Sequence, residues 1–309
     1  MKQTRALMEG AILISLFAII TLLVVYVPLV GTILLFVLPL PMILYTIRHG
    51  LKLGIWMGVV SLPVVFIVGS FNGLIVAFMS ACAGIAMGHY FKKKEPGHAV
   101  ISGALIYMLC IVFYIVISIQ FLGTNIIDEA MTNSRQSLDI VETVGKQTGN
   151  AEQFEKQLKL MEEQLGTAQY LFPTAIVVLG AVFSFLSYLI AKPLLRRFSP
   201  DIPNLKPFRE LKFPQSVVVL YLMIVMLSFL PLEKGQMLYS IALNGEFILG
   251  FLIFIQGVSF IFFYCHKKQY PKAVAVIAVI LGFVHPIFMA AIRILGVLDM
   301  GFQIRNKVK

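Results

Sequence analysis

Charged side chains are scarce in this chain, which holds 25 Lys and Arg and 15 Asp and Glu among its 309 residues. Only 13% of the residues are charged, whereas 59% are hydrophobic and the mean hydropathy is +0.90. Soluble domains average about 25% charged residues, so the composition excludes that class. Apolar runs also reach the roughly 20 residues that a helix needs to cross a bilayer. The sequence therefore predicts an integral membrane protein.

Motifs for catalysis and metal binding are lacking. The sequence has no HExxH, GxSxG or phosphate-loop pattern, and no two of its five histidines stand at metal-ligand spacing. The three cysteines, Cys82, Cys110 and Cys265, fall in apolar segments at unrelated spacings, which excludes a CxxC site. We therefore expect no enzymatic activity, no metal site and no cofactor.

Acidic residues are outnumbered, which gives a formal net charge of +10. A basic surface can indicate nucleic-acid binding. Here, however, Lys and Arg gather in short clusters between apolar runs, which is the orientation signal of a membrane protein. We expect the lipid bilayer as a partner and no nucleic acid.

The apolar runs predict nine segments of membrane-spanning length. They are expected at Ala6–Tyr26, Leu29–Ile47, Leu51–Gly69, Gly73–Phe91, Ala99–Leu122, Tyr170–Leu195, Gln215–Leu232, Leu238–Cys265 and Ala273–Val297. A cytoplasmic N-terminus places 16 of the 25 basic residues on the inner side and 5 in outer loops. Because inner loops carry the excess of Lys and Arg, this orientation is the expected one.

The last segment leaves the number of crossings open. Nine crossings would put Arg305, Lys307 and Lys309 outside, against the charge rule. His285-Pro286 interrupts this segment, so a re-entrant or split segment would return the tail to the inside. Eight and nine crossings both remain possible from the sequence.

Two polar intervals divide the chain. Residues 124–167 carry eight acidic and four basic residues and would lie outside. Phe154, Leu158, Met161 and Leu165 recur there at helical spacing, which predicts an extracytoplasmic helical hairpin. Residues 192–214 form a basic, proline-rich cytoplasmic loop suited to anionic lipid or a cytoplasmic partner. The predicted parts are a five-span core (1–123), the hairpin (124–167) and C-terminal membrane helices (168–309).

Four polar residues lie inside the late apolar segments: Asn244, Glu246, His285 and Arg293. Ionisable groups at membrane depth are expensive and usually face a cavity or a partner, so these four are the candidate substrate-binding residues. A Glu246–Arg293 ion pair is one interpretation. A pair that only locks two helices together, or an Arg293 that snorkels to the headgroups, is the alternative.

Small residues recur every four positions in two segments. Ala11 and Ser15 form such a pair in the first segment, and Ser80, Gly84 and Gly88 form a row in the fourth. These faces allow close helix approach. They could pack within the chain or dock another membrane subunit.

Two stretches resemble known families. The ending ILGVLDMGFQIRNK, with Asp299 and Arg305 in a G-x-x-D-x-G-F-x-x-R arrangement, resembles the YybS-like polytopic membrane proteins of Gram-positive bacteria. The proline-broken stretch LPLPMILYTIRHGLKLGIWMGVV is similar to the S components of energy-coupling-factor vitamin transporters. That resemblance implies an S-component-like N-terminal core and a coupling subunit docked through a first-helix A-x-x-x-A motif, which here reads Ala11-x-x-x-Ser15.

Together these observations predict an all-α, polytopic transmembrane helical bundle of eight or nine spans in a bacterial cell membrane. Its S-component-like N-terminal core would be joined by the extracytoplasmic hairpin. The expected function is the binding or permeation of a small-molecule ligand together with partner subunits. The alternative is a membrane scaffold that recruits envelope or sporulation proteins through the hairpin.

Overall fold

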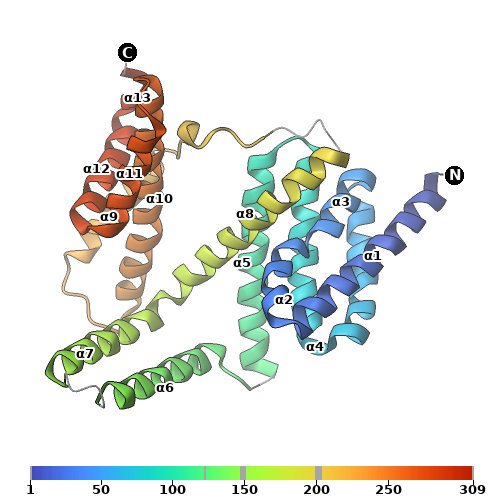
Figure 1. Cartoon of the computed structure of the whole chain (residues 1–309), viewed down its shortest axis with the longest axis horizontal. Helices are drawn as coiled ribbons and strands as arrows, with labels where there is room; N and C mark the ends of the chain where they lie inside the picture. The colour runs from blue at the N-terminus through green and yellow to red at the C-terminus, as the bar shows by residue number, and fades with distance from the viewer. Residues whose placement is uncertain (1, 122, 147–150, 199–203, 308–309) are drawn as a thin grey trace. The chain divides into compact units, whose positions relative to one another are not determined.

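The computed structural model describes residues 2–121, 123–146, 151–198 and 204–307, and all regular elements in these ranges are helices (Figure 1). Six of the helices are long and apolar enough to cross a membrane. A seventh span is present if the bent pair α11 (Lys272–Val284) and α12 (Pro286–Phe302) is counted as one. The predicted all-α polytopic bundle is confirmed, while the count of eight or nine crossings stays a prediction.

The helices form two compact units. The first contains Met1–Ile140 and Ala175–Leu205, and the second contains Val141–Thr174 and Lys206–Lys309. The helices of the first unit are α1 (Lys2–Tyr26), α2 (Pro28–Val37), α3 (Leu40–His49), α4 (Leu51–Lys92), α5 (Pro96–Phe121), most of α6 (Ile126–Lys146) and most of α8 (Phe172–Phe198). The second holds α7 (Ala151–Ala168), α9 (Ser216–Ser228), α10 (Met237–Lys267), α11, α12 and α13 (Ile304–Lys307).

This grouping differs from the sequence-based division, which placed everything after residue 167 with the C-terminal helices. Helix α8 packs with the N-terminal unit because Ser184 donates a 2.6 Å hydrogen bond to the Val100 carbonyl of α5. A Cβ on Gly180 would lie 2.6 Å from Met108, so α8 and α5 approach closely there as well. Sequence periodicity does not specify which neighbour a helix selects.

Prolines divide the predicted second span into α2 and α3. Pro28 is at the first position of α2, where its missing N–H costs nothing, and Pro39 follows the end of that helix. Helix α3 then packs against the second half of α4, where a Cβ on Gly84 would lie 2.6 Å from the Pro39 carbonyl oxygen.

Helix α4 folds back on itself at Ser70. Its 42 residues would extend about 63 Å, twice the roughly 30 Å hydrocarbon core. Ser70 has φ 56° and ψ −164°, which breaks the helix. The two halves then lie side by side, since a Cβ on Gly58 would be 2.9 Å from Ile85. The halves correspond to the segments predicted at Leu51–Gly69 and Gly73–Phe91.

In the second unit, α10 and α12 run parallel and in close contact. A Cβ on Gly257 would clash with the Ile292 carbonyl oxygen, and one on Gly296 would clash with that of Ile253. Only glycine permits this backbone approach. The crossing fixes the C-terminal end of α12 at the end of α10.

The α11–α12 pair bends by 120° at His285-Pro286. Helix α11 has 13 residues and spans about 20 Å, which is short of the roughly 30 Å core. Because α12 runs parallel to α10, its last residues return to the end of the unit that carries Lys267 and Lys272. This geometry favours the re-entrant interpretation of the last predicted span over a full ninth crossing.

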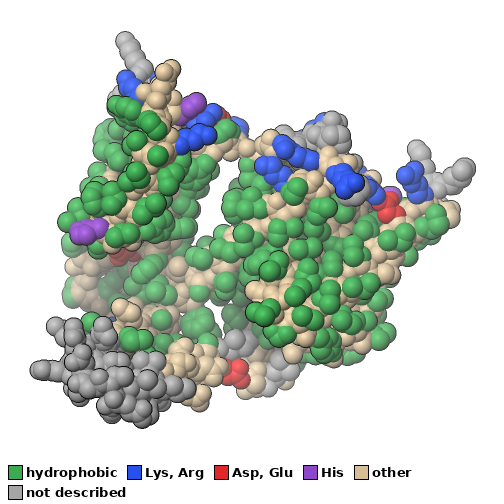
Figure 2. Space-filling view, viewed as in Figure 1, with side chains coloured by type: hydrophobic (Ala, Val, Ile, Leu, Met, Phe, Trp, Pro, Cys, Tyr) green, Lys and Arg blue, Asp and Glu red, His purple; other side chains and the backbone are tan. Residues whose placement is uncertain are grey.

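Hydrophobic side chains cover most of the visible helix surface, and in each unit Lys and Arg gather at one end (Figure 2). Such a surface suits lipid on the sides and water at the ends. The chain therefore has the exterior expected of a multi-pass membrane protein. Which end faces the cytoplasm stays a prediction.

The polar intervals are helical in part. Helices α6 and α7 occupy most of residues 124–167, while their packing as an outer hairpin stays a prediction. The side chains of Phe154 and Leu158 lie outside the described ones. Residues 204–214 of the basic loop are irregular apart from a short 3-10 turn at Phe208–Glu210, and 199–203 lie outside the described residues.

Candidate functional site

Asn244 links α10 to the start of α8 through side-chain hydrogen bonds. Its Oδ1 accepts hydrogen bonds from the Thr174 backbone N–H at 3.0 Å and from the Thr174 hydroxyl at 2.7 Å. Its Nδ2 donates to the carbonyls of Tyr170 at 2.7 Å and Ser240 at 2.8 Å. The amide is fully engaged and buried, so it has a structural role and no free group to offer a ligand.

Glu246 and Arg293 do not form the predicted ion pair. Within the described part of the chain, no carboxylate lies within 4.0 Å of the Arg293 guanidinium. The guanidinium instead lies against Gly250 of α10, where a Cβ would be 3.3 Å from its Cζ. Glu246 stands one helical turn away from Gly250 on the same face of α10. The sequence could not predict this offset between two helices.

Arg293 retains an unused donor. Its Nε is buried and has no hydrogen-bond partner among the described residues. The side chain lines a groove of about 440 Å³ between α9 and α12, together with Tyr221, Pro286, Met289, Ala290, Ile294, Val297 and Leu298. The groove is thus apolar apart from the Arg293 cation and the Tyr221 hydroxyl.

His285 caps the break between α11 and α12. Its side chain is exposed, and its Nδ1 accepts the Ile287 backbone N–H at 3.2 Å. This is the N-cap geometry that satisfies an otherwise orphaned donor. His285 is the N-cap of α12, the helix that carries Arg293, but the structure does not bring Asn244 and His285 to one site.

The two rows of small residues have different environments. Gly84 and Gly88 face α3, where a Cβ on Gly88 would lie 2.8 Å from Thr46, and Ser80 is buried. That face is occupied within the chain and is closed to another subunit. Ala11 and Ser15 are exposed, and the Ser15 hydroxyl donates to the Ala11 carbonyl at 3.0 Å. The docking interpretation therefore rests on Ala11 and Ser15 alone.

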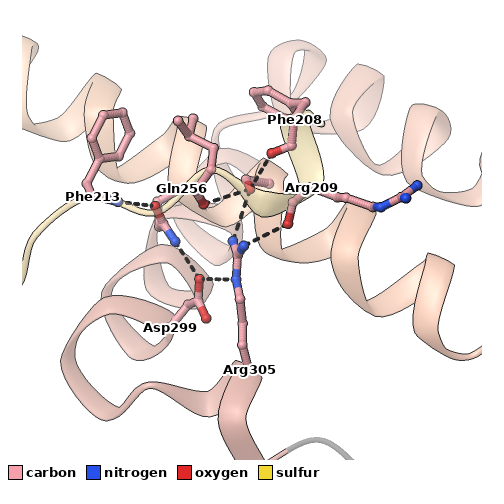
Figure 3. A network of polar contacts seen from close by, with 8 residues as sticks. Phe208, Arg209, Phe213, Gln256, Asp299 and Arg305 are labelled. Atoms are coloured by element: carbon pink, nitrogen blue, oxygen red, sulfur yellow. Dashed lines mark hydrogen bonds and ion pairs between the residues drawn. The ribbon is translucent and has the colours of Figure 1, made fainter. Parts of the chain in front are cut away.

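A second polar cluster, which the sequence did not single out as a site, lies at the end of α12. The Arg305 Nε donates to Asp299 Oδ2 at 2.7 Å, and both side chains are at most 3% exposed (Figure 3). Its two other nitrogens donate to the Arg209 carbonyl at 2.8 Å and to the Ser259 hydroxyl at 3.0 Å. The Asp299–Arg305 pair thus anchors the chain end to α10 and to the basic loop.

Gln256 completes this cluster from α10. Its Nε2 donates to Asp299 Oδ2 at 2.5 Å, while its Oε1 accepts the Phe213 backbone N–H at 3.0 Å. The Ser259 hydroxyl donates to the Phe208 carbonyl at 2.7 Å. Gln256 and Ser259 lie one helical turn apart inside an otherwise apolar run. That spacing was the available sequence signal for this cluster.

Asp299 has one unsatisfied oxygen. Oδ1 is buried without a hydrogen-bond partner in the described ranges, and in Figure 3 it points away from the dashed contacts. Leaving such an acceptor unpaired costs about 1–3 kcal/mol or more. Asp299 also lines a pocket of about 190 Å³ with Lys212, Phe213, Gln215, Gln256, Met300, Gln303, Arg305 and Asn306.

The helical bundle, its apolar exterior and its few buried polar clusters define a polytopic integral membrane protein. The chain belongs to the family described as "Predicted membrane protein (DUF2232)", whose model matches residues 15–300. It is 92% identical, over the full length of both chains, to the Bacillus subtilis (strain 168) protein named "Uncharacterized protein YybS". The resemblance to YybS-like proteins is thereby confirmed.

No solved structure matches the chain significantly. The likeness of the N-terminal core to S components therefore stays a prediction. The same holds for the coupling subunit that this likeness implies.

Proposed function

We propose that the protein binds a small solute carrying an anionic group at membrane depth and mediates its permeation. The observation that carries this proposal is the Arg293 cation, which lines a groove and has a buried Nε without a partner in the described chain. An anionic group in the groove would supply both the countercharge and the missing acceptor.

The depth of Arg293 supports this role. It precedes Phe302, the last residue of α12, by nine residues, or about 14 Å along the helix. That places it near the middle of a roughly 30 Å core if α12 ends at the membrane surface. A lone charge at this depth costs about 2.5–3.5 kcal/mol or more. The cost favours a bound countercharge.

The break at His285-Pro286 is a second supporting feature. In many transporters, binding sites lie near the midplane beside discontinuous helices, whose N-termini favour anionic groups. Helix α12 begins at such a break, and its second turn, at Met289 and Ala290, lines the groove. Glu246, one turn from Gly250, would confine the anion to the Arg293 side by like-charge repulsion.

The proposal is tested by thermal unfolding of the purified protein in detergent with sodium chloride, acetate, phosphate and citrate at matched ionic strength. At least one anion should raise the midpoint in a saturable manner, because ligand at 100 times Kd adds about 2.7 kcal/mol of stability. Arg293→Gln should abolish this shift, and Arg293→Lys should retain part of it.

Arg197→Gln is the matched control, because this arginine is exposed and lies far along the chain from the groove. It should keep the full response. The proposal fails if no anion gives a saturable shift, or if the shift survives in Arg293→Gln.

A further inference from the structure

We propose that the pocket beside Asp299 is a second binding site, which takes a compact zwitterion such as a free α-amino acid. The ammonium group would donate to Asp299 Oδ1, and the carboxylate would face Lys212. This pocket shares no lining residue with the Arg293 groove, so the inference does not depend on the function proposed above.

The asymmetry of the Asp299 carboxylate is the first argument. Oδ2 accepts two hydrogen bonds, from Arg305 and Gln256, whereas Oδ1 accepts none within the described residues. Arginine and carboxylate commonly pair through two parallel hydrogen bonds, which would use both oxygens. Here the other two nitrogens of Arg305 donate to the Arg209 carbonyl and to the Ser259 hydroxyl. The arrangement leaves Oδ1 available for a donor that these side chains do not supply.

The size and lining of the pocket are the second argument. Its volume of about 190 Å³ is below the roughly 300–1,000 Å³ of sites for drug-sized ligands, so it suits a compact molecule. Four amide side chains line it in addition to the charged groups: Gln215, Gln256, Gln303 and Asn306. Amides both donate and accept hydrogen bonds, which suits a ligand with both kinds of group.

The distribution of charge is the third argument. Asp299 and Arg305 are buried and cancel each other, whereas Lys212 is exposed and adds a positive charge to the lining. A simple cation would be repelled by Lys212 and Arg305, and a simple anion would meet Asp299. A zwitterion with its ammonium at Asp299 and its carboxylate at Lys212 would place each of its charges beside an opposite one.

The test uses three probes: glycine, methylammonium chloride and sodium acetate. Each is titrated by calorimetry into the purified full-length protein in detergent at matched ionic strength. Glycine should bind saturably, and at least tenfold more tightly than either single-charge probe. Lys212→Gln should weaken glycine binding about tenfold, which corresponds to about 1.4 kcal/mol. Lys268→Gln, which removes an exposed lysine that does not line the pocket, should leave it unchanged.

Asp299→Asn should abolish glycine binding, because the ammonium loses its countercharge. Where this variant does not fold, Lys212→Gln decides the matter, since Lys212 is exposed and its removal leaves the buried pair intact. Glycine binding no tighter than methylammonium or acetate would overturn the proposal. Equal glycine affinity in wild type and Lys212→Gln would overturn it as well.

Discussion

Arg305 donates to Asp299 across only six residues of chain, yet the pair joins three separate segments of the second unit. Asp299 belongs to α12, Arg305 to α13, and the guanidinium also holds the Arg209 carbonyl of the basic loop. A buried ion pair contributes to stability only when its remaining donors and acceptors are used. Arg305 meets this condition, while Asp299 keeps one oxygen unpaired.

Breaking this pair should destabilise the protein. Arg305→Gln leaves the Asp299 charge buried and unpaired, and Asp299→Asn leaves that of Arg305, so each should cost about 3–5 kcal/mol. The double variant should lose less than the sum, because neither charge remains. Thermal and denaturant unfolding of the three variants in detergent measure this. Strictly additive losses would show that the two side chains do not interact.

The glycines of the α10–α12 crossing should tolerate no side chain. Gly257→Ala and Gly296→Ala each place a Cβ against a backbone carbonyl oxygen and should cost about 1–3 kcal/mol. Gly301→Ala is the control, since nothing lies within 4 Å of a Cβ there. Unfolding midpoints compare the three. Equal midpoints for Gly296→Ala and Gly301→Ala would contradict the close crossing.

The topology can be tested with single cysteines in a background lacking the three native ones. Thr132→Cys in α6 should react with an impermeant thiol reagent in intact cells. Lys268→Cys and Asn306→Cys should react only after permeabilisation, because α12 returns the chain end to the side of Lys267–Lys272. Labelling of Asn306→Cys in intact cells, with Lys268→Cys protected, would instead establish a ninth crossing.

The exposed Ala11–Ser15 face can be tested for docking of a coupling subunit. Replacing both residues by leucine should abolish co-purification of an ATPase module from native membranes, because small residues set the distance of helix approach. Leu16→Phe, on an adjacent exposed face of α1, should leave it unchanged. Both variants should keep the wild-type unfolding midpoint. Equal recovery of the module with the double variant would assign the pair to lipid contact.

The fold class was predictable from the sequence because membrane helices need long apolar runs, and these stand out in any window. The two halves of α4 match two predicted segments, and the break at Ser70 falls in the interval between them, where Gly69 and Gly73 flank it. The prolines Pro28 and Pro39 likewise mark the ends of α1 and α2. Apolar runs and proline positions thus predicted the positions of the helices, whereas they left the number of membrane crossings open.

The site was less predictable, because it depends on how helices pair. The sequence predicted Asn244 as a ligand residue, yet Thr174, the distant Tyr170 carbonyl and the Ser240 carbonyl one turn earlier on α10 satisfy its amide. The Glu246–Arg293 pair required a register between α10 and α12 that Gly257 and Gly296 determine. The spacing of Gln256 and Ser259 marks a polar face of α10 in the sequence, but their partners Asp299 and Arg305 follow only from that register.

The most direct test of the account is a calorimetric titration of the most stabilising anion into wild-type protein and into Arg293→Gln. The account predicts a single saturable site in the wild type and at least a tenfold larger Kd in the variant, since each tenfold corresponds to about 1.4 kcal/mol. Arg197→Gln should match the wild type. An unchanged Kd in a folded Arg293→Gln variant would contradict the assignment of Arg293 as the solute-binding cation.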